Sequence, residues 1–390
     1  MKPLLALSLI ARLPVAMLSI GLLVHTEHAT GTYAAAGLVA GAFALAQGSG
    51  GPLLGRLVDR RGQTTVLVAA ALAAGVALAA TAALPSDAPL GARIALAILA
   101  GATMPPVGAA FRALLPGLVT PHADRRDAAL RSAYATDAAA VELTWVAGPP
   151  VVLALGAAVS TGAALAAAGA LLTFSTLVFA SSPASRHWRP ERVERRHGAL
   201  RAPGMRTLAA VLLAVGLVFG AVEVAVTASA DAFGTAGAAG PLLGLWGIGS
   251  LIGGLVAAKL GGGARTGAGL VVLLAALGVT HGALALAANP VMLGALVTVA
   301  GATIAPTFAT VYTMVDAVAP KGAATEAFAW LATTTAVGAS GGAAVSGALT
   351  DFAGAPAAFV VAGAAAAVAA LVAVTRGRTL PGGVPAVAPA

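Results

Sequence analysis

Ionisable side chains stand alone inside long apolar runs of this 390-residue sequence. Arg12, Glu142 and Glu223 are each surrounded by Ala, Leu, Val and similar residues, and Asp137 lies in the same apolar run as Glu142. A charge at the centre of a membrane helix costs at least about 2.5 kcal/mol on insertion scales, so such residues typically form an ion pair, carry a proton or contact a substrate. We therefore take these four residues as the candidate proton or substrate site.

The composition indicates that these residues lie in a membrane protein. Hydrophobic residues make up 59% of the chain and charged residues 9%, whereas soluble domains contain about 25% charged residues. The chain has no cysteine, which excludes disulfides, thiolate chemistry and cysteine-based metal sites. Its basic residues are scattered between apolar runs and aromatics are 4%, so we expect no nucleic-acid partner.

Apolar stretches of about twenty residues, the length that crosses a bilayer as a helix, recur along the chain. They predict an all-α integral membrane protein with twelve transmembrane helices. The predicted spans are Leu4–Val24, Tyr33–Leu54, Thr64–Leu84, Ala92–Leu114, Ala133–Leu155, Ser160–Ala180, Leu208–Ala230, Ala239–Leu260, Gly267–Ala288, Val291–Thr313, Glu326–Leu349 and Ala357–Thr375.

The basic residues predict the orientation of these helices. If the N-terminus is inside, all Lys and Arg except Arg12 and Arg93 fall in the cytoplasmic connections, at the inner ends of helices or in the tails. Cytoplasmic loops carry an excess of Lys and Arg. We therefore expect a multi-pass protein of the cell membrane with both termini in the cytoplasm, and the basic isoelectric point follows from this topology.

The longest connection divides the chain into six helices and six. Residues 181–206 contain seven Arg and two Glu, typical of a solvated linker or of a segment that rests on anionic lipid. The expected organisation is an N-terminal bundle at 1–180, this cytoplasmic linker, a C-terminal bundle at 207–376 and a disordered cytoplasmic tail at 377–390.

The two halves share a short motif. The sequence AGATMPP at 100–106 recurs as AGATIAP at 300–306, at the same place in each half. A tandem repeat predicts a pseudo-two-fold axis along the membrane normal with the substrate path between the halves. Proline and glycine at these positions and on the fifth helix predict breaks that free backbone groups toward a cavity. The predicted break residues are Pro105, Pro106, Pro306, Gly148 and Pro149.

The sequence GRLVDRRGQ, residues 55–63, forms the predicted cytoplasmic turn between helices 2 and 3. Gly55 and Gly62 permit close approach and positive φ in a tight reversal. Asp59 can accept hydrogen bonds at the N-terminus of a neighbouring helix, and the arginines that follow it can pair with carboxylates or lipid phosphate. The predicted second-half counterpart at 258–267 keeps Lys259 and Arg265 but has no aspartate.

This turn resembles the helix 2 to 3 loop of the major facilitator superfamily, whose pattern is G-x-x-x-D-R-x-G-R/K. Gly55, Asp59, Arg60 and Gly62 match the pattern, and Gln63 departs from its final basic residue. The resemblance covers the whole chain through the twelve helices and the central basic loop. The resemblance implies two six-helix bundles that rock about a central cavity, with this loop as a cytoplasmic latch. It also implies that the protein binds a small-molecule substrate and contacts lipids, and that protons are the coupling ion. A monomeric state and the absence of a cofactor are expected as well.

The sequence WVAGPPVV on the fifth helix resembles a Gly-Pro motif of drug and proton antiporters, with Gly148 and Pro149 matching. The fourth helix lacks the mid-membrane arginine of those antiporters, since Arg93 lies at its outer edge and Arg112 at its inner end. Export of a drug-like or amphipathic molecule is favoured over import of a sugar or organic acid. A non-transporting sensor or scaffold with the same fold is the third hypothesis.

The isolated ionisable residues have alternative roles. Arg12 and Glu142 reach similar depth, so they form either a structural ion pair or a proton or substrate site. Glu223, with no cation on its helix, is either a proton carrier or a hydrogen-bonded or water-exposed carboxylate. Asp137 is expected to reach cytoplasmic water, and Glu326 to favour the start of the eleventh helix. The sequence has no motif of a nucleotide-binding loop, a metalloprotease or a serine hydrolase, so we expect no enzyme.

Overall fold

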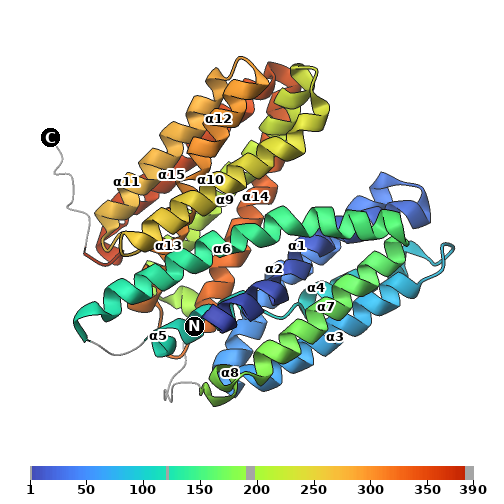
Figure 1. Cartoon of the computed structure of the whole chain (residues 1–390), viewed down its shortest axis with the longest axis horizontal. Coiled ribbons are helices and arrows are strands. Elements are labelled where there is room, and N and C mark those ends of the chain that lie inside the picture. Colours follow the sequence, from blue (N-terminus) through green and yellow to red (C-terminus); the bar gives the residue numbers. More distant parts are fainter. Residues whose placement is uncertain (1, 120–122, 190–197, 383–390) are drawn as a thin grey trace. The chain divides into compact units, whose positions relative to one another are not determined.

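The structure, a computed structural model, describes residues 2–119, 123–189 and 198–382. Over these residues the regular structure is entirely helical, so the predicted all-α class is confirmed (Figure 1). The helices of the first part are α1 (Lys2–Thr30), α2 (Tyr33–Arg61), α3 (Gln63–Ala83), α4 (Leu90–Ala102), α5 (Val107–Leu118), α6 (Ala123–Ala158), α7 (Thr161–Ser181) and the short α8 (Pro183–His187).

The second part contains α9 to α15 and four short 3₁₀ turns. These helices are α9 (Pro203–Ala232), α10 (Ala239–Lys259), α11 (Gly267–Gly282), α12 (Pro290–Gly301), α13 (Ile304–Val318), α14 (Ala324–Ala353) and α15 (Ala355–Thr375), and the 3₁₀ turns are Ala199–Arg201, Ala236–Ala238, Ala283–Leu286 and Gly377–Thr379. Within the part of the chain that the structure describes, ten spans are long and apolar enough to cross a membrane. With α2 at 29 residues and α14 at 30, they supply the twelve predicted helices.

Local sequence sets many helix ends. Thr32, Ser160, Thr266 and Asn289 each cap the helix that follows them, because their side-chain oxygens accept a backbone N–H of its first turn. Proline stands in the first turn of α8, α9, α12 and α15, where its missing N–H has no cost.

The chain forms two compact units. The first comprises residues 1–118, 143–198 and 321–333, and the second comprises 119–142, 199–320 and 334–390. Helices α6 and α14 therefore contribute one part to each unit. The predicted linker and tail lie partly outside the described residues, at 190–197 and 383–390.

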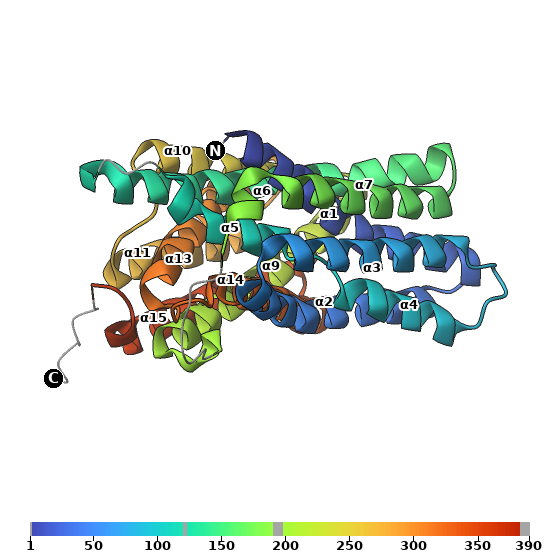
Figure 2. The same cartoon turned by 90° about the horizontal axis from the view of Figure 1, so that it is seen from below.

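In the first unit, α3 packs against α7 and α2 against α4, as the two views show (Figures 1 and 2). Its core gathers apolar side chains from several helices, including Leu18, Phe43 and Leu78. The α2 and α4 backbones approach closely because Gly101 of α4 has no side chain. A Cβ on Gly101 would lie 2.3 Å from the Phe43 carbonyl oxygen of α2.

In the second unit, α15 packs against α9 and α11, and α10 against α12. Gly301 repeats the arrangement of Gly101, since a Cβ there would lie 2.1 Å from the Trp246 carbonyl oxygen of α10. The two copies of the repeated motif thus fulfil the same packing role within their own units.

The motif also coincides with interruptions of both helices. The chain leaves the helix between α4 and α5, where Pro105 and Pro106 lie, and between α12 and α13 at Ala302 and Thr303. Pro306 is in the first turn of α13, so it follows the second interruption and does not form it.

The predicted break at Gly148 and Pro149 is wrong. Helix α6 continues through both residues to Ala158, and membrane helices tolerate such prolines when neighbouring groups satisfy the freed carbonyl. Gly148 serves packing instead, because a Cβ on it would meet the Ala16 Cβ of α1 at 2.7 Å.

Glycines of α9 and the C-terminal part of α14 contact each other's backbones reciprocally within the second unit. A Cβ on Gly216 or Gly220 would lie about 2 Å from a carbonyl oxygen of α14, and one on Gly338 or Gly342 equally close to a carbonyl of α9. At these four positions the backbones lie so close that only glycine fits between them.

Candidate functional site

A single residue reverses the chain between α2 and α3. Gly62 has φ +96°, a value that residues with a side chain rarely adopt. Its N–H donates to the Val58 carbonyl, and α3 starts at the next residue. The turn therefore holds the last turn of α2, which carries Asp59, in a fixed position against α3.

Asp59 caps the N-terminus of α14. Its side chain is buried, and its Oδ1 and Oδ2 accept the backbone N–H groups of Thr325 at 3.1 Å and Glu326 at 2.8 Å. Gly55, one turn earlier on α2, allows this approach, because a Cβ there would lie 2.9 Å from the Glu326 Cα. A carboxylate at a helix N-terminus satisfies orphan donors and interacts favourably with the helix dipole.

Two effects oppose each other on the Asp59 carboxyl, which lies beyond the predicted membrane segment of α2. Burial raises its pKa, and the hydrogen bonds from Glu326 and Thr325 lower it; the net result is a pKa of about 6 against an ordinary value of 3.8. Desolvation therefore outweighs the two backbone donors. The carboxyl is ionised at neutral pH and becomes protonated in mild acid.

Arg56 joins the same contact through an ion pair that the sequence reasoning missed. Its Nε and Nη2 donate to the two Glu326 carboxylate oxygens, each at 3.0 Å, a bidentate geometry. Arg60, which matches the loop pattern, is exposed. The i, i+3 spacing of Arg56 and Asp59 on one helix face was the signal available in the sequence.

The second unit contains a polar cluster on one face of α10. The Ser250 hydroxyl donates to Glu142 Oε1 at 2.9 Å, and Trp246, four residues earlier, donates its Nε1–H to His281 Nε2 at 3.1 Å. The other nitrogen of His281 lies 2.8 Å from the Leu277 carbonyl. Since a carbonyl only accepts, His281 holds its proton on Nδ1 and accepts at Nε2.

A row of aromatic rings connects this cluster to a second carboxylate. Trp246 packs edge-on against Phe219 at 5.2 Å between centroids, Phe219 stacks on Phe308 at 5.9 Å, and Phe308 lies 5.7 Å from Tyr312. Tyr312 lies 6.4 Å from Tyr134, whose hydroxyl donates to Asp316 at 2.9 Å. The row ends at the Asp316 carboxylate, and Glu142 is held by Ser250, one turn along α10 from Trp246. Aromatic rings near carboxylates suit an aromatic or cationic amphipathic molecule.

Glu223 and Asp137 have environments that differ from each other. Glu223 is exposed on α9, while its neighbours Val222 and Val226 are buried. Asp137 is fully buried, so the expectation that it reaches cytoplasmic water is wrong. Because α6 starts at Ala123 and not near residue 133, Asp137 lies almost four turns into the helix and not in its first turn, where surrounding side chains enclose it.

Arg12 is buried in the first unit. Its Nε donates to the Ser8 carbonyl at 3.2 Å, and its guanidinium carbon lies 5.8 Å from the centre of the Phe111 ring of α5. Gly108 leaves room for it, since a Cβ there would lie 3.1 Å from the Arg12 Cδ. Glu142 belongs to the other unit, so the expected ion pair stays a prediction.

Among the described residues, no group of three or more His, Cys, Asp or Glu could hold a metal ion. In the second unit, Glu142 and Asp316 therefore each accept a hydrogen bond from a hydroxyl group, and the rings between Trp246 and Tyr134 pack on one another.

Comparisons with known proteins agree with the helical fold. The family model described as Major Facilitator Superfamily matches residues 4–261. No curated protein matches the chain. Three solved structures resemble it over nearly their whole length. The human organic anion transporter MFSD10 (TETRAN) is 16% identical with a TM-score of 0.68, and the match covers 95% of this chain and 97% of that one. A bacterial homologue of the iron transporter ferroportin, in an outward-facing state with soaked iron, is 16% identical with a TM-score of 0.71, and the E. coli fucose:proton symporter FucP is 15% identical with a TM-score of 0.71; each of these two matches covers 96% of this chain and 98% of the other.

Proposed function

Because the chain belongs to the major facilitator superfamily, we propose that it is a secondary active transporter that exports a small amphipathic molecule across the cell membrane in exchange for protons. The capping of α14 by Asp59 is the observation that carries the proposal. Asp59 joins the α2–α3 turn of the first half to the start of a second-half helix, so this contact must break whenever the cytoplasmic ends of the two halves separate.

The contact has the properties of a latch. Two charge-assisted hydrogen bonds and a bidentate ion pair gather on one turn of α2, and each is directional. Alternating access needs two states of comparable free energy. A polar contact of this size can hold one state without making it permanent, since the half-exposed ion pair of Arg56 and Glu326 contributes about 1 kcal/mol or less and a helix cap contributes about 1 kcal/mol.

The aromatic row supports the proposed substrate class. Rings of Phe219, Phe308 and Tyr312 supply apolar contacts for an amphipathic molecule, while Glu142 and Asp316 suit a positive group on it. A sugar importer would use more polar side chains along such a row. Fucose:proton symport by a structural neighbour keeps import of a sugar or organic acid as the alternative.

Glu223 is our first candidate for the residue that carries the coupling proton. An exposed carboxylate on a membrane helix cannot face hydrocarbon without a large cost, so its exposure favours a position on a water-filled path. Arg12 with Glu142, and Asp137, are the other candidates. Both termini face the cytoplasm in this proposal, as the Lys and Arg distribution predicts.

Counterflow in proteoliposomes tests the proposal. Vesicles that contain the purified chain and an unlabelled aromatic cation should accumulate labelled cation transiently, and an imposed proton gradient should drive net movement. Exchange without any response to the proton gradient would remove the coupling. Absence of exchange with cations, sugars and organic acids would favour the non-transporting sensor or scaffold.

A further inference from the structure

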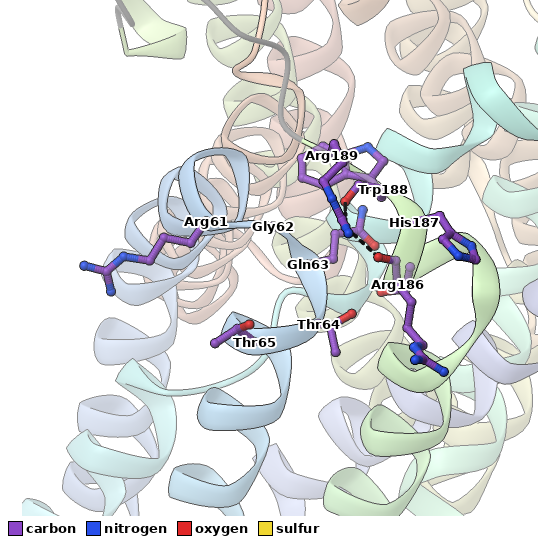
Figure 3. Close-up of a pocket in the computed structure, with 10 residues that line it drawn as sticks. Arg61, Gly62, Gln63, Thr64, Thr65, Arg186, His187, Trp188 and Arg189 are labelled. Carbon is purple, nitrogen blue, oxygen red and sulfur yellow. Dashed lines mark hydrogen bonds between the residues drawn. The ribbon is translucent and has the colours of Figure 1, made fainter.

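A cavity of about 330 Å³ lies in the first unit, next to the turn between α2 and α3. The start of α3 and the residues just before it form one side of the cavity, and residues 185–189, at the end of α8, form the other (Figure 3). Neither the transport proposal nor the loop pattern assigns a role to this cavity.

The N-terminus of α3 opens into the cavity without a side-chain cap. The cap residue is Gly62, which has no side chain to accept the first backbone N–H groups, and the first-turn residues Gln63, Thr64 and Thr65 line the cavity. These N–H groups point away from the helix body, and the helix dipole adds positive potential there. The α3 terminus therefore presents donors for an anion.

Two buried polar atoms in the cavity wall have no partner among the described residues. Gln63 is fully buried; its amide nitrogen donates to the Ala110 carbonyl at 3.0 Å, which leaves its Oε1 without a donor. The hydroxyl oxygen of Ser185, a residue 1% exposed, is also without a hydrogen bond. Buried groups of this kind normally have a hydrogen-bond partner. A ligand with a hydroxyl could donate to Gln63 Oε1, and an anionic oxygen on the same ligand could accept from the Ser185 hydroxyl.

The charge around the cavity is positive. Arg61, Arg186 and Arg189 line it, and none of the lining residues that the structure describes is acidic. Figure 3 shows the Arg189 side chain beside Gln63, with Arg61 and Arg186 extending outward on either side. Arg189 Nη1 donates to the Arg186 and Trp188 carbonyls, which leaves the rest of its guanidinium for a ligand.

We propose that this cavity binds a phosphoryl group, carried by the glycerol headgroup of an anionic phospholipid. The phosphate oxygens accept from the α3 N-terminus, Ser185 and the arginines, and a headgroup hydroxyl donates to Gln63 Oε1. Trp188, next to the cavity, is the residue type enriched where lipid headgroups meet protein. Free phosphate shares the phosphoryl chemistry but lacks the hydroxyl and the acyl chains.

Binding to the purified full-length chain tests this site. The probes are a short-chain phosphatidylglycerol, the matching phosphatidylcholine, glycerol phosphate and inorganic phosphate, each titrated by thermal shift in neutral detergent. Thr65→Glu places a carboxylate in the first turn of α3, where it favours the helix and occupies the site itself. Arg189→Gln removes one charge, and Arg206→Gln at the start of α9 is the matched control, because Arg206 is also exposed but lies outside the cavity.

Phosphatidylglycerol should stabilise the wild type, and phosphatidylcholine should not. The affinity for phosphatidylglycerol should fall about tenfold or more in Thr65→Glu and Arg189→Gln, which is the effect expected for the loss of a charge-assisted hydrogen bond. It should stay unchanged in Arg206→Gln. Without ligand, Thr65→Glu should unfold at the wild-type temperature or above. Equal phosphatidylglycerol affinity in Thr65→Glu and wild type would overturn the site. If inorganic phosphate competes equally well at the site, the phosphoryl site stands and the lipid source is wrong.

Discussion

The carboxylate of Asp59 accepts the backbone N–H of Glu326 at 2.8 Å, across 267 positions of sequence. The same Glu326 holds Arg56 through its side chain. One residue at the start of α14 therefore receives two contacts from a single turn of α2, through its backbone and through its carboxylate. Separation of these helices must break both contacts together.

Asp59→Asn should slow transport about fivefold while the chain still inserts in the membrane. An amide has one acceptor oxygen, so one of the two backbone N–H groups would face the amide nitrogen, at a cost of about 1 kcal/mol, typical of a lost helix cap. The measurement is the initial rate of counterflow at equal protein density. Asp87→Asn, an exposed aspartate in the α3–α4 connection, is the control and should be silent; normal exchange in Asp59→Asn would remove the gating role.

Mild acid should strengthen the Asp59 contact. The pKa of Asp59 is raised to about 6 in the contact and returns toward 3.8 when separation hydrates the carboxyl, so the contact binds a proton more tightly than the separated state. The added stability is fully present below pH 4, is lost as pH rises through 6, and is constant above. Unlike an amide nitrogen, a protonated carboxyl oxygen can still accept an N–H.

A fluorophore on Arg60→Cys reports this pH response, since the chain has no other cysteine and Arg60 is exposed close to Asp59. The signal should change between pH 4 and pH 6. The same label on Asp59→Asn should give a flat profile over that range. A transition that survives the Asn substitution belongs to another group.

The ion pair between Arg56 and Glu326 should contribute modestly. The Arg56 side chain is 44% exposed, so solvent screens the pair and a double-mutant cycle with Arg56→Gln and Glu326→Gln should give a coupling of about 0.5 kcal/mol in thermal unfolding. Salt at 1 M should reduce it. A coupling above 2 kcal/mol would show that the pair is far less hydrated than its exposure indicates.

If Arg12 and Glu142 pair in the membrane, loss of one partner should be worse than loss of both. A single uncompensated buried charge costs about 3 to 5 kcal/mol, whereas a neutral pair leaves none. Arg12→Met and Glu142→Gln should each lower the yield of folded protein, and the double variant should recover part of it. A double variant as poor as the sum of the single variants would mean that the two residues never meet.

Glu223→Gln should abolish the pH dependence of uphill transport and leave downhill exchange intact. Its carboxyl lies exposed among buried valines of α9, and the amide keeps its size without a titratable proton. Asp231→Asn, at the exposed end of the same helix, is the matched control. If Glu223→Gln still concentrates substrate under a proton gradient, Glu142 becomes the leading coupling residue.

Apolar length and turn chemistry made the helices predictable. The starts of α2, α10 and α11 agree with the predicted spans to the residue, because Thr32 and Thr266 are caps and a 3₁₀ turn precedes Ala239. The start of α6 was missed by ten residues. Its first turns carry Arg and Asp, which hydropathy assigns to a loop although they are compatible with a helix that extends beyond the membrane.

Contacts between distant segments were less accessible. The sequence indicated that Asp59 would cap some helix, and nothing in its own turn specified α14. No sequence pattern indicated a role for Phe219, Ser250 or His281. They belong to the polar cluster and the aromatic row because α10 places Trp246 and Ser250 on one face, where both contact neighbouring helices. Only the packing of helices reveals such a row.

The reciprocal glycines of α9 and α14 limit how this protein can vary. At Gly216, Gly220, Gly338 and Gly342 any side chain would collide with a main-chain oxygen, which cannot move aside as a flexible side chain would. Even alanine should separate the two helices there, so a side chain at any of these four positions would require the backbones of α9 and α14 to move apart. The face of α9 that carries Glu223 is free of this constraint, because Glu223 is exposed.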